Sequence, residues 1–364
     1  MPVSDYFGRD YDAARARFRA AAAAAQATLS SWELPQRKGP KDEPLTLDVA
    51  RIGAAEADRA LLIVSGTHGV EGFCGSGCQV GFFIDRLYEA LPAAACALLI
   101  HALNPFGFAW LRRVNEDGID LNRNFVDFDQ ALPSSAAYEP LHECLVPAAW
   151  EGPERTRADA ALQGFIQQRG MRAVQTALTG GQYTRPTGLF YGGRRRTWSA
   201  ERLAEILRTQ LPPTVQHLAV LDLHTGLGPT GYGEAAVFTE SASEAARCRR
   251  WYGAEIRDLA ADESVSAPIV GSVAAGVRAA LPDRQLTYVG LEFGTRPVLE
   301  VLSALRHDHC VAARAHAGVD ERRAAQQQMR DAFYCENAAW QAAVYGRFAD
   351  FAYRAARGLA EELH

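Results

Sequence analysis

Residues 61–72 have the sequence LLIVSGTHGVEG, in which an apolar run leads directly into a small, polar turn. The run 61–64 is typical of a short buried strand, and the Ser and Gly residues after it allow the chain to turn sharply. His68 and Glu71 follow three residues apart, so both side chains can face one metal ion. Two histidines and a carboxylate form one kind of three-ligand zinc site that activates a water molecule.

The His-x-x-Glu pattern alone also fits a simpler interpretation. His68 can be a loop histidine, and Glu71 can be a solvated residue whose charge favours the start of a helix. Such a short pattern recurs by chance in unrelated proteins. Three further segments decide between the two interpretations.

The first is a polar loop at residues 112–125, RRVNEDGIDLNRNF. Arg113 and Arg123 offer planar forks that suit carboxylates or developing oxyanions. Asn122 supplies a paired donor and acceptor, and Asp120 can fix the tautomer of a ligand histidine. The alternative is an ordinary surface loop whose charges neutralise one another.

The second segment is LAVLDLHTGLG at residues 218–228. Its apolar part predicts a central parallel strand, with His224 where the strand gives way to a loop. Open α/β sheets place their sites at the carboxyl ends of strands, which favours His224 as the third metal ligand. Asp222 lies on the same strand face and can support that histidine, or it can only close a hydrogen bond at the strand edge.

The third segment is TYVGLEFGT at residues 287–295, where Glu292 interrupts an apolar run. A carboxylate inside an apolar strand is costly unless it is paired or functional. Beside a metal, Glu292 would be the general base for the bound water. The alternative is a structural ion pair between Glu292 and Arg296.

Taken together, these segments resemble the zinc carboxypeptidase superfamily, whose fold the succinylglutamate desuccinylase and aspartoacylase enzymes also use. Within it the chain looks like the bacterial group catalogued as domain of unknown function 2817. The resemblance covers most of the chain and rests on five blocks, namely GTHGVEG at 66–72, NPFGF at 104–108, the loop at 112–125, DLHTG at 222–226 and LEFGT at 291–295. It implies a zinc-carboxypeptidase-like fold.

The resemblance also implies a role for each matching residue. One Zn²⁺ ion would be held by three ligands, His68, Glu71 and His224. Glu292 would act as the base, and Arg113 would steady the tetrahedral oxyanion. Asn122 and Arg123 would hold the terminal carboxylate of a substrate, with Asp120 behind the first histidine. The mobile tyrosine of the digestive carboxypeptidases has no clear match, and the candidates are Tyr191, Tyr232 and Tyr288.

Strand-like and helical patterns alternate along the chain, which predicts an α/β fold with three α/β/α layers and a mixed, mostly parallel sheet. Strands are expected at residues 45–52, 61–64, 97–103, 218–223, 235–239 and 287–292. Helices are expected at residues 12–30, 77–90, 159–178, 200–210 and 321–361.

No Pro/Ser-rich linker or repeat divides the chain. The connection from Phe125 to Leu218 is long, and its Gly/Arg-rich turn at 180–196 can line a pocket mouth or be a solvated basic turn. We therefore expect one catalytic domain over residues 1–364, with an inserted helical or lid region at about 126–217.

The composition limits the partners. The 364 residues carry a net charge of −5 with interspersed signs, so no basic face for nucleic acid is expected. No run reaches the ~20 apolar residues of a membrane span, and the first residues lack a signal-peptide pattern. The seven cysteines are expected to be reduced. These features predict a cytoplasmic protein without a nucleic-acid or membrane partner, and they leave a homo-oligomer open.

Three functions fit these residues. The first is a zinc-dependent metallopeptidase of carboxypeptidase type, which hydrolyses an amide bond next to a free carboxylate and is favoured by Asn122 and Arg123. The second is a zinc amidohydrolase that removes the acyl group from an N-acyl amino acid. The third, a non-catalytic metal-binding protein, gives no reason for Glu292 beside a complete ligand set.

Overall fold

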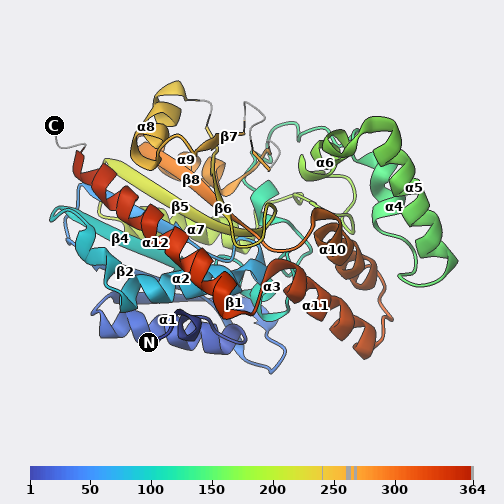
Figure 1. Cartoon of the computed structure of the whole chain (residues 1–364), viewed down its shortest axis with the longest axis horizontal. Coiled ribbons are helices and arrows are strands. Elements are labelled where there is room, and N and C mark those ends of the chain that lie inside the picture. Colours follow the sequence, from blue (N-terminus) through green and yellow to red (C-terminus); the bar gives the residue numbers. More distant parts are fainter. Residues whose placement is uncertain (240, 260–263, 266–268, 362–364) are drawn as a thin grey trace.

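The computed structural model describes residues 1–239, 241–259, 264–265 and 269–361, and this part of the chain contains an eight-stranded mixed sheet. The strand order is β1-β2-β4-β3-β5-β8-β6-β7 (Figure 1). The strands are β1 (Thr28–Lys38), β2 (Pro44–Gly53), β3 (Arg59–Val64), β4 (Ala95–His101), β5 (His217–Gly226), β6 (Gly233–Val237), β7 (Arg257–Asp258) and β8 (Gln285–Gly294). The four central strands β4, β3, β5 and β8 are parallel, and the pairs β1–β2, β2–β4 and β6–β8 are antiparallel.

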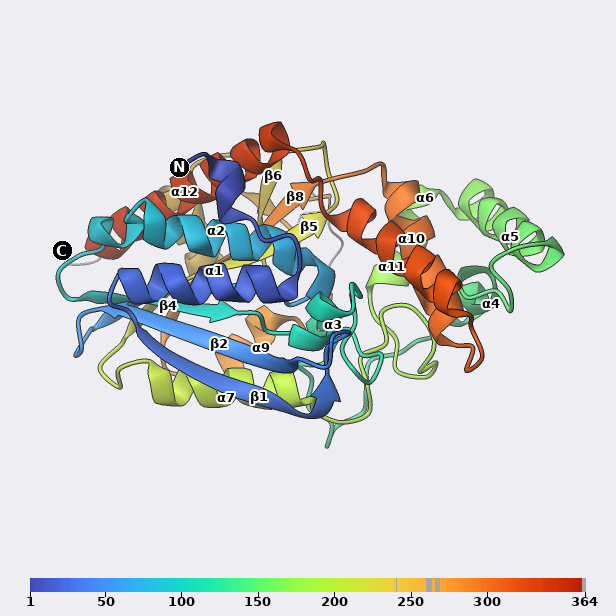
Figure 2. The same ribbon diagram turned by 90° about the horizontal axis from the view of Figure 1, so that it is seen from below.

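Helices cover both faces of the sheet, so the predicted three-layer α/β class is confirmed (Figure 2). One face is packed by α1 (Tyr11–Ala24), α2 (Gly72–Ile84) and α12 (Ala338–Glu361), and the other by α7 (Trp198–Gln210) and α9 (Val273–Ala280). Leu61 and Ile63 of β3 pack into the hydrophobic core on the face covered by α1, α2 and α12. Leu62 and Val64 pack into the core on the opposite face, under α7 and α9. Burial of both strand faces explains why the run 61–64 is apolar without alternation.

Several other helices lie beyond one end of the sheet in both views (Figures 1 and 2). They are α4 (His142–Leu145), α5 (Pro153–Arg169), α6 (Met171–Thr179), α10 (Val298–Ala312) and α11 (Val319–Phe333). Arg306 of α10 contacts both α4 and α5. It donates to the carbonyl of Cys144 in α4 at 2.7 Å and forms an ion pair with Asp159 of α5 at 2.7 Å. Helices α4 to α6 occupy the stretch for which an insertion is predicted. The extent of that insertion and the single-domain organisation stay predictions.

Several predicted element boundaries are wrong. The first helix ends at Ala24 rather than near residue 30, because the chain turns at Gln26, whose φ is +61°, and enters strand β1. This strand was missed because it is an edge strand with mostly exposed side chains, so its sequence has little apolar pattern. The stretch predicted as one helix over 321–361 is two, and Asn337 caps the second by accepting from the backbone N–H of Trp340.

Other helices also differ from expectation. Helix α2 begins at Gly72 and ends at Ile84, five to six residues earlier than predicted, and Arg86 with φ +55° follows it. The helix expected at 159–178 is divided at Gly170 into α5 and α6. Helices α8 (Ala242–Tyr252), α9 and α10 were not predicted. Within the described ranges, no helix has the length and apolar character that crossing a bilayer requires.

Candidate active site

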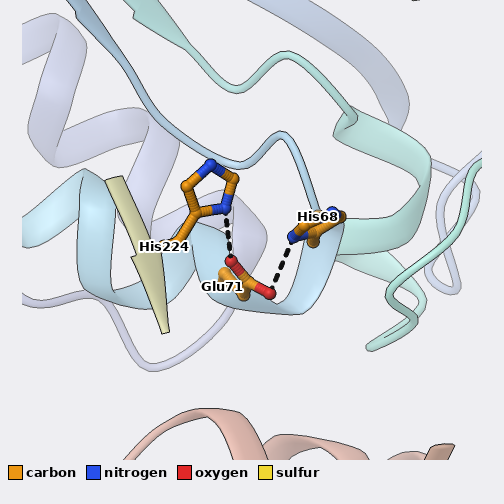
Figure 3. A group of neighbouring side chains, drawn as sticks. All are labelled: His68, Glu71 and His224. Atoms are coloured by element: carbon orange, nitrogen blue, oxygen red, sulfur yellow. Dashed lines mark hydrogen bonds and ion pairs between the residues drawn. The ribbon is translucent and has the colours of Figure 1, made fainter. Parts of the chain in front are cut away.

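The three predicted metal ligands lie together at the carboxyl ends of β3 and β5. His68 and Glu71 flank the short turn after β3, and His224 is near the end of β5, the parallel neighbour of β3. In Figure 3 the two imidazoles face opposite oxygens of the Glu71 carboxylate. His68 Nδ1 lies 2.9 Å from Glu71 Oε1, and His224 Nδ1 lies 3.1 Å from Glu71 Oε2.

The turn that carries His68 is held by close backbone packing. A Cβ atom on Gly69 would lie 2.0 Å from the carbonyl carbon of Gly107 in the neighbouring helix α3 (Pro105–Ala109). The Gly69 N–H also donates to the carbonyl of Arg113 at 3.1 Å. A side chain at position 69 would therefore push His68 away from the loop that carries the arginine.

Each imidazole is supported from behind by a carboxylate. Asp120 Oδ1 lies 3.2 Å from His68 Nε2, and Asp222 Oδ2 lies 2.8 Å from His224 Nε2. The Tyr288 hydroxyl also donates to Asp222 Oδ2 at 2.6 Å. An Nε2–H of His224 that donates to Asp222 leaves the Nδ1 lone pair of His224 facing Glu71, whereas His68 Nε2 also lies 2.7 Å from the donor Nη2 of Arg113.

The donor set fits a zinc ion. The described residues offer one buried cluster of two imidazoles and a carboxylate whose ligand atoms lie within 4.8 Å of one another. Although burial opposes ionisation, the charges of His68 and His224 hold the pKa of Glu71 well below its usual value. Burial also opposes ionisation of Asp120, yet Arg113 and His68 hold its pKa well below the usual range. Three such ligands leave a position for water, which is typical of catalytic zinc.

Glu292 lies on β8, directly opposite His224 of β5 in the strand register. Its Oε1 accepts a hydrogen bond from the Leu227 N–H at 3.0 Å. Desolvation, together with the negative charge of nearby Glu71, raises the pKa of Glu292 to about 7. A carboxylate with this pKa can accept and return a proton near neutral pH.

Some alternatives suggested by the sequence do not match the coordinates. Arg296 is exposed and donates to the Asp331 carbonyl at 3.3 Å, so it does not neutralise Glu292 in the described structure. The three candidate tyrosines are Tyr191, Tyr232 and Tyr288. None of them is among the described residues that line the pocket.

Arg113 contacts Asp120, Glu71 and the His68 ring, whose Nε2 lies 2.7 Å from Arg113 Nη2. Its Nε donates to Asp120 Oδ2 and its Nη1 to Glu71 Oε1, each at 3.1 Å. The guanidinium is mostly buried, so these charge-assisted hydrogen bonds are little screened by solvent. Arg113 is therefore placed next to the metal ligands and lines the pocket in front of them.

Asn122 and Arg123 are neighbours in the chain and also line the pocket. Asn122 Oδ1 accepts from the Val273 N–H at 2.8 Å, which leaves the side-chain NH₂ group to donate. Arg123 donates from Nε to the carbonyl of Thr179 at 2.9 Å and from Nη1 to the carbonyl of Asn122 at 2.8 Å. Desolvation lowers the pKa of Arg123 to about 10, so the guanidinium remains charged at neutral pH.

These groups surround one pocket with a cavity volume of about 110 Å³. The polar lining contains both histidines, both arginines, Asn122 and Glu292. Seven of the described residues form the apolar lining, namely Phe190, Leu227, Phe238, Ile269, Val301, Leu305 and Phe333. The pocket thus brings the metal cluster, a base and two cations into contact with one bound molecule.

The sequence analysis missed Thr179 and Phe190, which belong to the connection between β4 and β5. Backbone hydrogen bonds attach this segment to the polar loop, because Asp120 N–H donates to the Tyr191 carbonyl at 2.8 Å. The Tyr183 hydroxyl also donates to the Arg123 carbonyl at 2.7 Å. Only the Gly/Arg-rich composition of residues 180–196 signalled a pocket mouth here.

The sheet has a carboxypeptidase-like α/β fold, with a candidate metal cluster at the carboxyl ends of its strands. The family described as "Protein of unknown function (DUF2817)" matches residues 7–347, and the chain belongs to this family. No curated protein matches the chain.

The chain is similar to solved structures at low sequence identity, and the first structure below shares its fold. Bovine thrombin-activatable fibrinolysis inhibitor, in complex with tick carboxypeptidase inhibitor, is 10% identical, with 98% of this chain and 99% of that chain covered and a TM-score of 0.51. A metallo-carboxypeptidase from Burkholderia cenocepacia is 12% identical over 99% of this chain and 71% of its own, with a TM-score of 0.45. An aspartoacylase family protein from Mesorhizobium loti is 17% identical over 78% and 67% of the two chains, with a TM-score of 0.37.

Proposed function

We propose that this protein is a zinc-dependent metallopeptidase of carboxypeptidase type, which hydrolyses an amide bond next to a free carboxylate. One observation carries the proposal: the cluster of His68, Glu71 and His224 opens into the same pocket as Glu292 and Arg123. A metal site, a base and a carboxylate-binding cation are the three parts that this reaction needs.

A zinc ion held by the three ligands would supply the Lewis acidity that polarises the scissile carbonyl and acidifies a water molecule. Glu292 accepts the proton of the attacking water at its carboxylate and returns it to the leaving amine. Arg113 donates to the negative oxygen that develops at the former carbonyl. Asp222 keeps the His224 imidazole in the tautomer that presents Nδ1, and Asp120 holds the orientation of the His68 ring.

Arg123 and the NH₂ group of Asn122 bind the carboxylate of the substrate. A buried guanidinium recognises such a group strongly, because the charge-assisted hydrogen bonds are shielded from water. The apolar wall of the pocket favours an apolar side chain beside this carboxylate, since Glu292 is the one acid among the described residues that line it.

A zinc amidohydrolase acting on N-acyl amino acids is the second candidate. Two observations favour it: Thr179 and Phe190 from the connection between β4 and β5 line the pocket, and no tyrosine of the described residues does. A cavity of about 110 Å³ that is open to solvent suits a small substrate as well as the end of a peptide.

A substrate panel separates the two candidates. The zinc-loaded protein is assayed with peptides that have a free C-terminus, with the same peptides amidated, and with N-acyl amino acids. We expect hydrolysis of free-carboxylate peptides, loss of activity with a chelator, and recovery with zinc. Hydrolysis of N-acyl amino acids alone would establish the second candidate, and zinc-dependent activity toward neither class would reject both.

A further inference from the structure

Phe190 is an unusual residue in the wall of the pocket. Its backbone φ is +55°, in the left-handed region that side chains other than glycine rarely adopt. Its side chain is nevertheless 7% exposed and lines the pocket. Strained backbone at a buried site persists only when its surroundings impose it, and such sites are often functional.

The surroundings of Phe190 hold its backbone on both sides. The Phe190 carbonyl accepts from the Gln182 N–H at 3.1 Å, and the next carbonyl, of Tyr191, accepts from the Asp120 N–H at 2.8 Å. Asn124 Nδ2 donates to the carbonyl of Gly192 at 2.8 Å. The segment is thus fixed against the loop that carries Asp120 and Asn122.

The ring of Phe190 lies against both arginines of the pocket. The guanidinium carbon of Arg113 is 5.3 Å from the ring centroid, and that of Arg123 is 5.5 Å away. Both distances are within the range of cation–π attraction. The two cations repel each other in a buried site, and the electron-rich ring opposes this repulsion without using their hydrogen-bond donors.

We propose that Phe190 is a positioning residue that holds Arg123, beside Arg113, in the orientation that binds the substrate carboxylate. The proposal rests on the proposed function for the identity of the anion, which is the free carboxylate of the substrate. It makes the segment between β4 and β5 a part of the recognition site. Preorganisation of this kind lowers the ordering cost of binding.

The test measures binding of 3-phenylpropanoate to the zinc-loaded protein by calorimetry, which needs no turnover. Phe190→Leu keeps an apolar side chain but removes the ring, so we expect Kd to rise about tenfold. Phe190→Tyr keeps the ring and should bind within about twofold of the native protein. Phe165→Leu is the matched control, because its ring lies 5.4 Å from the Arg169 guanidinium outside the pocket and should not affect Kd.

A double-mutant cycle shows whether Phe190 acts through the arginine. In an Arg123→Gln background, Phe190→Leu should change Kd by less than about twofold, since the partner cation is absent. An unchanged Kd in Phe190→Leu, or the same tenfold loss in the Arg123→Gln background, would overturn the proposal. Phe190→Met serves as a second variant without a ring if Phe190→Leu does not fold. If the variants change 3-phenylpropanoate binding as expected but the native protein hydrolyses no substrate, the proposed function is rejected and the role of Phe190 is retained.

Discussion

His224 and Glu292 are directly opposite each other on the parallel strands β5 and β8. The strand pairing places the imidazole of a candidate metal ligand and a carboxylate of raised pKa at the same end of the sheet. Rigid strands position two groups more accurately than two loops would. In the proposed function, His224 binds the cation and Glu292 transfers the proton. Substitutions of the two residues should therefore have separable effects.

Glu292→Gln should remove the base and leave the metal ligands in place. We expect kcat to fall by about 10²–10⁴-fold, the usual contribution of a general base. Zinc content, measured by elemental analysis, should stay at the native level. Glu300→Gln changes an exposed acid on α10 and provides the matched control. A Glu292→Gln protein with native kcat would show that another group accepts the proton.

Asp222→Asn tests the support behind His224. The carboxylate accepts from the imidazole and from Tyr288, so its neutral amide should bind zinc about 10–100-fold more weakly. Zinc affinity is measured by competition with a chelator of known strength. Tyr288→Phe keeps the carboxylate and should cause a smaller loss. Equal zinc affinity in native and Asp222→Asn proteins would remove Asp222 from the metal site.

The raised pKa of Glu292 makes a prediction about stability in the metal-free protein. The folded pKa of about 7 lies above the ordinary value of 4.5, so between these values the folded state binds more protons than the unfolded state. The free energy of unfolding should therefore fall as pH rises through this window and level off above it. Urea unfolding from pH 4.5 to 8 measures this slope.

The comparison that isolates the pH effect uses Glu292→Gln, which cannot ionise. The free energy of unfolding of this variant, relative to the native protein, should increase as pH rises from 4.5 to 7. Parallel profiles for the two proteins would show that Glu292 titrates at its ordinary pKa when folded.

Arg123→Gln should weaken recognition of the free carboxylate. The loss of a buried charge-assisted contact predicts a decrease of about 100-fold in kcat/KM for a peptide with a free C-terminus. The amidated peptide, which lacks the anion, should lose much less. An equal loss for both peptides would mean that Arg123 serves the pocket only structurally, through its hydrogen bonds to Thr179.

The sequence predicted the parts of the site that strand ends bring together. His68 and Glu71 are close in the chain, and the apolar runs before His224 and around Glu292 identified buried parallel strands. Phe190 could not be predicted as a pocket residue, because it lies in a segment without helix or strand periodicity. Helix α10 was missed because it buries polar residues, including Arg306 and Asp308, through ion pairs with other elements.

Gly69→Ala tests how closely the turn after β3 must pack. The added Cβ would lie 2.0 Å from a backbone atom of Gly107, and backbone cannot move away as a flexible side chain can. We expect a loss of about 1–3 kcal/mol in the free energy of unfolding, as for other overpacked sites, together with weaker zinc binding. Gly318→Ala is the matched control, because nothing lies within 4 Å of its added Cβ and its φ is −64°. If the two alanine variants unfold at the same denaturant concentration and bind zinc equally, the contact between residues 69 and 107 does not position His68.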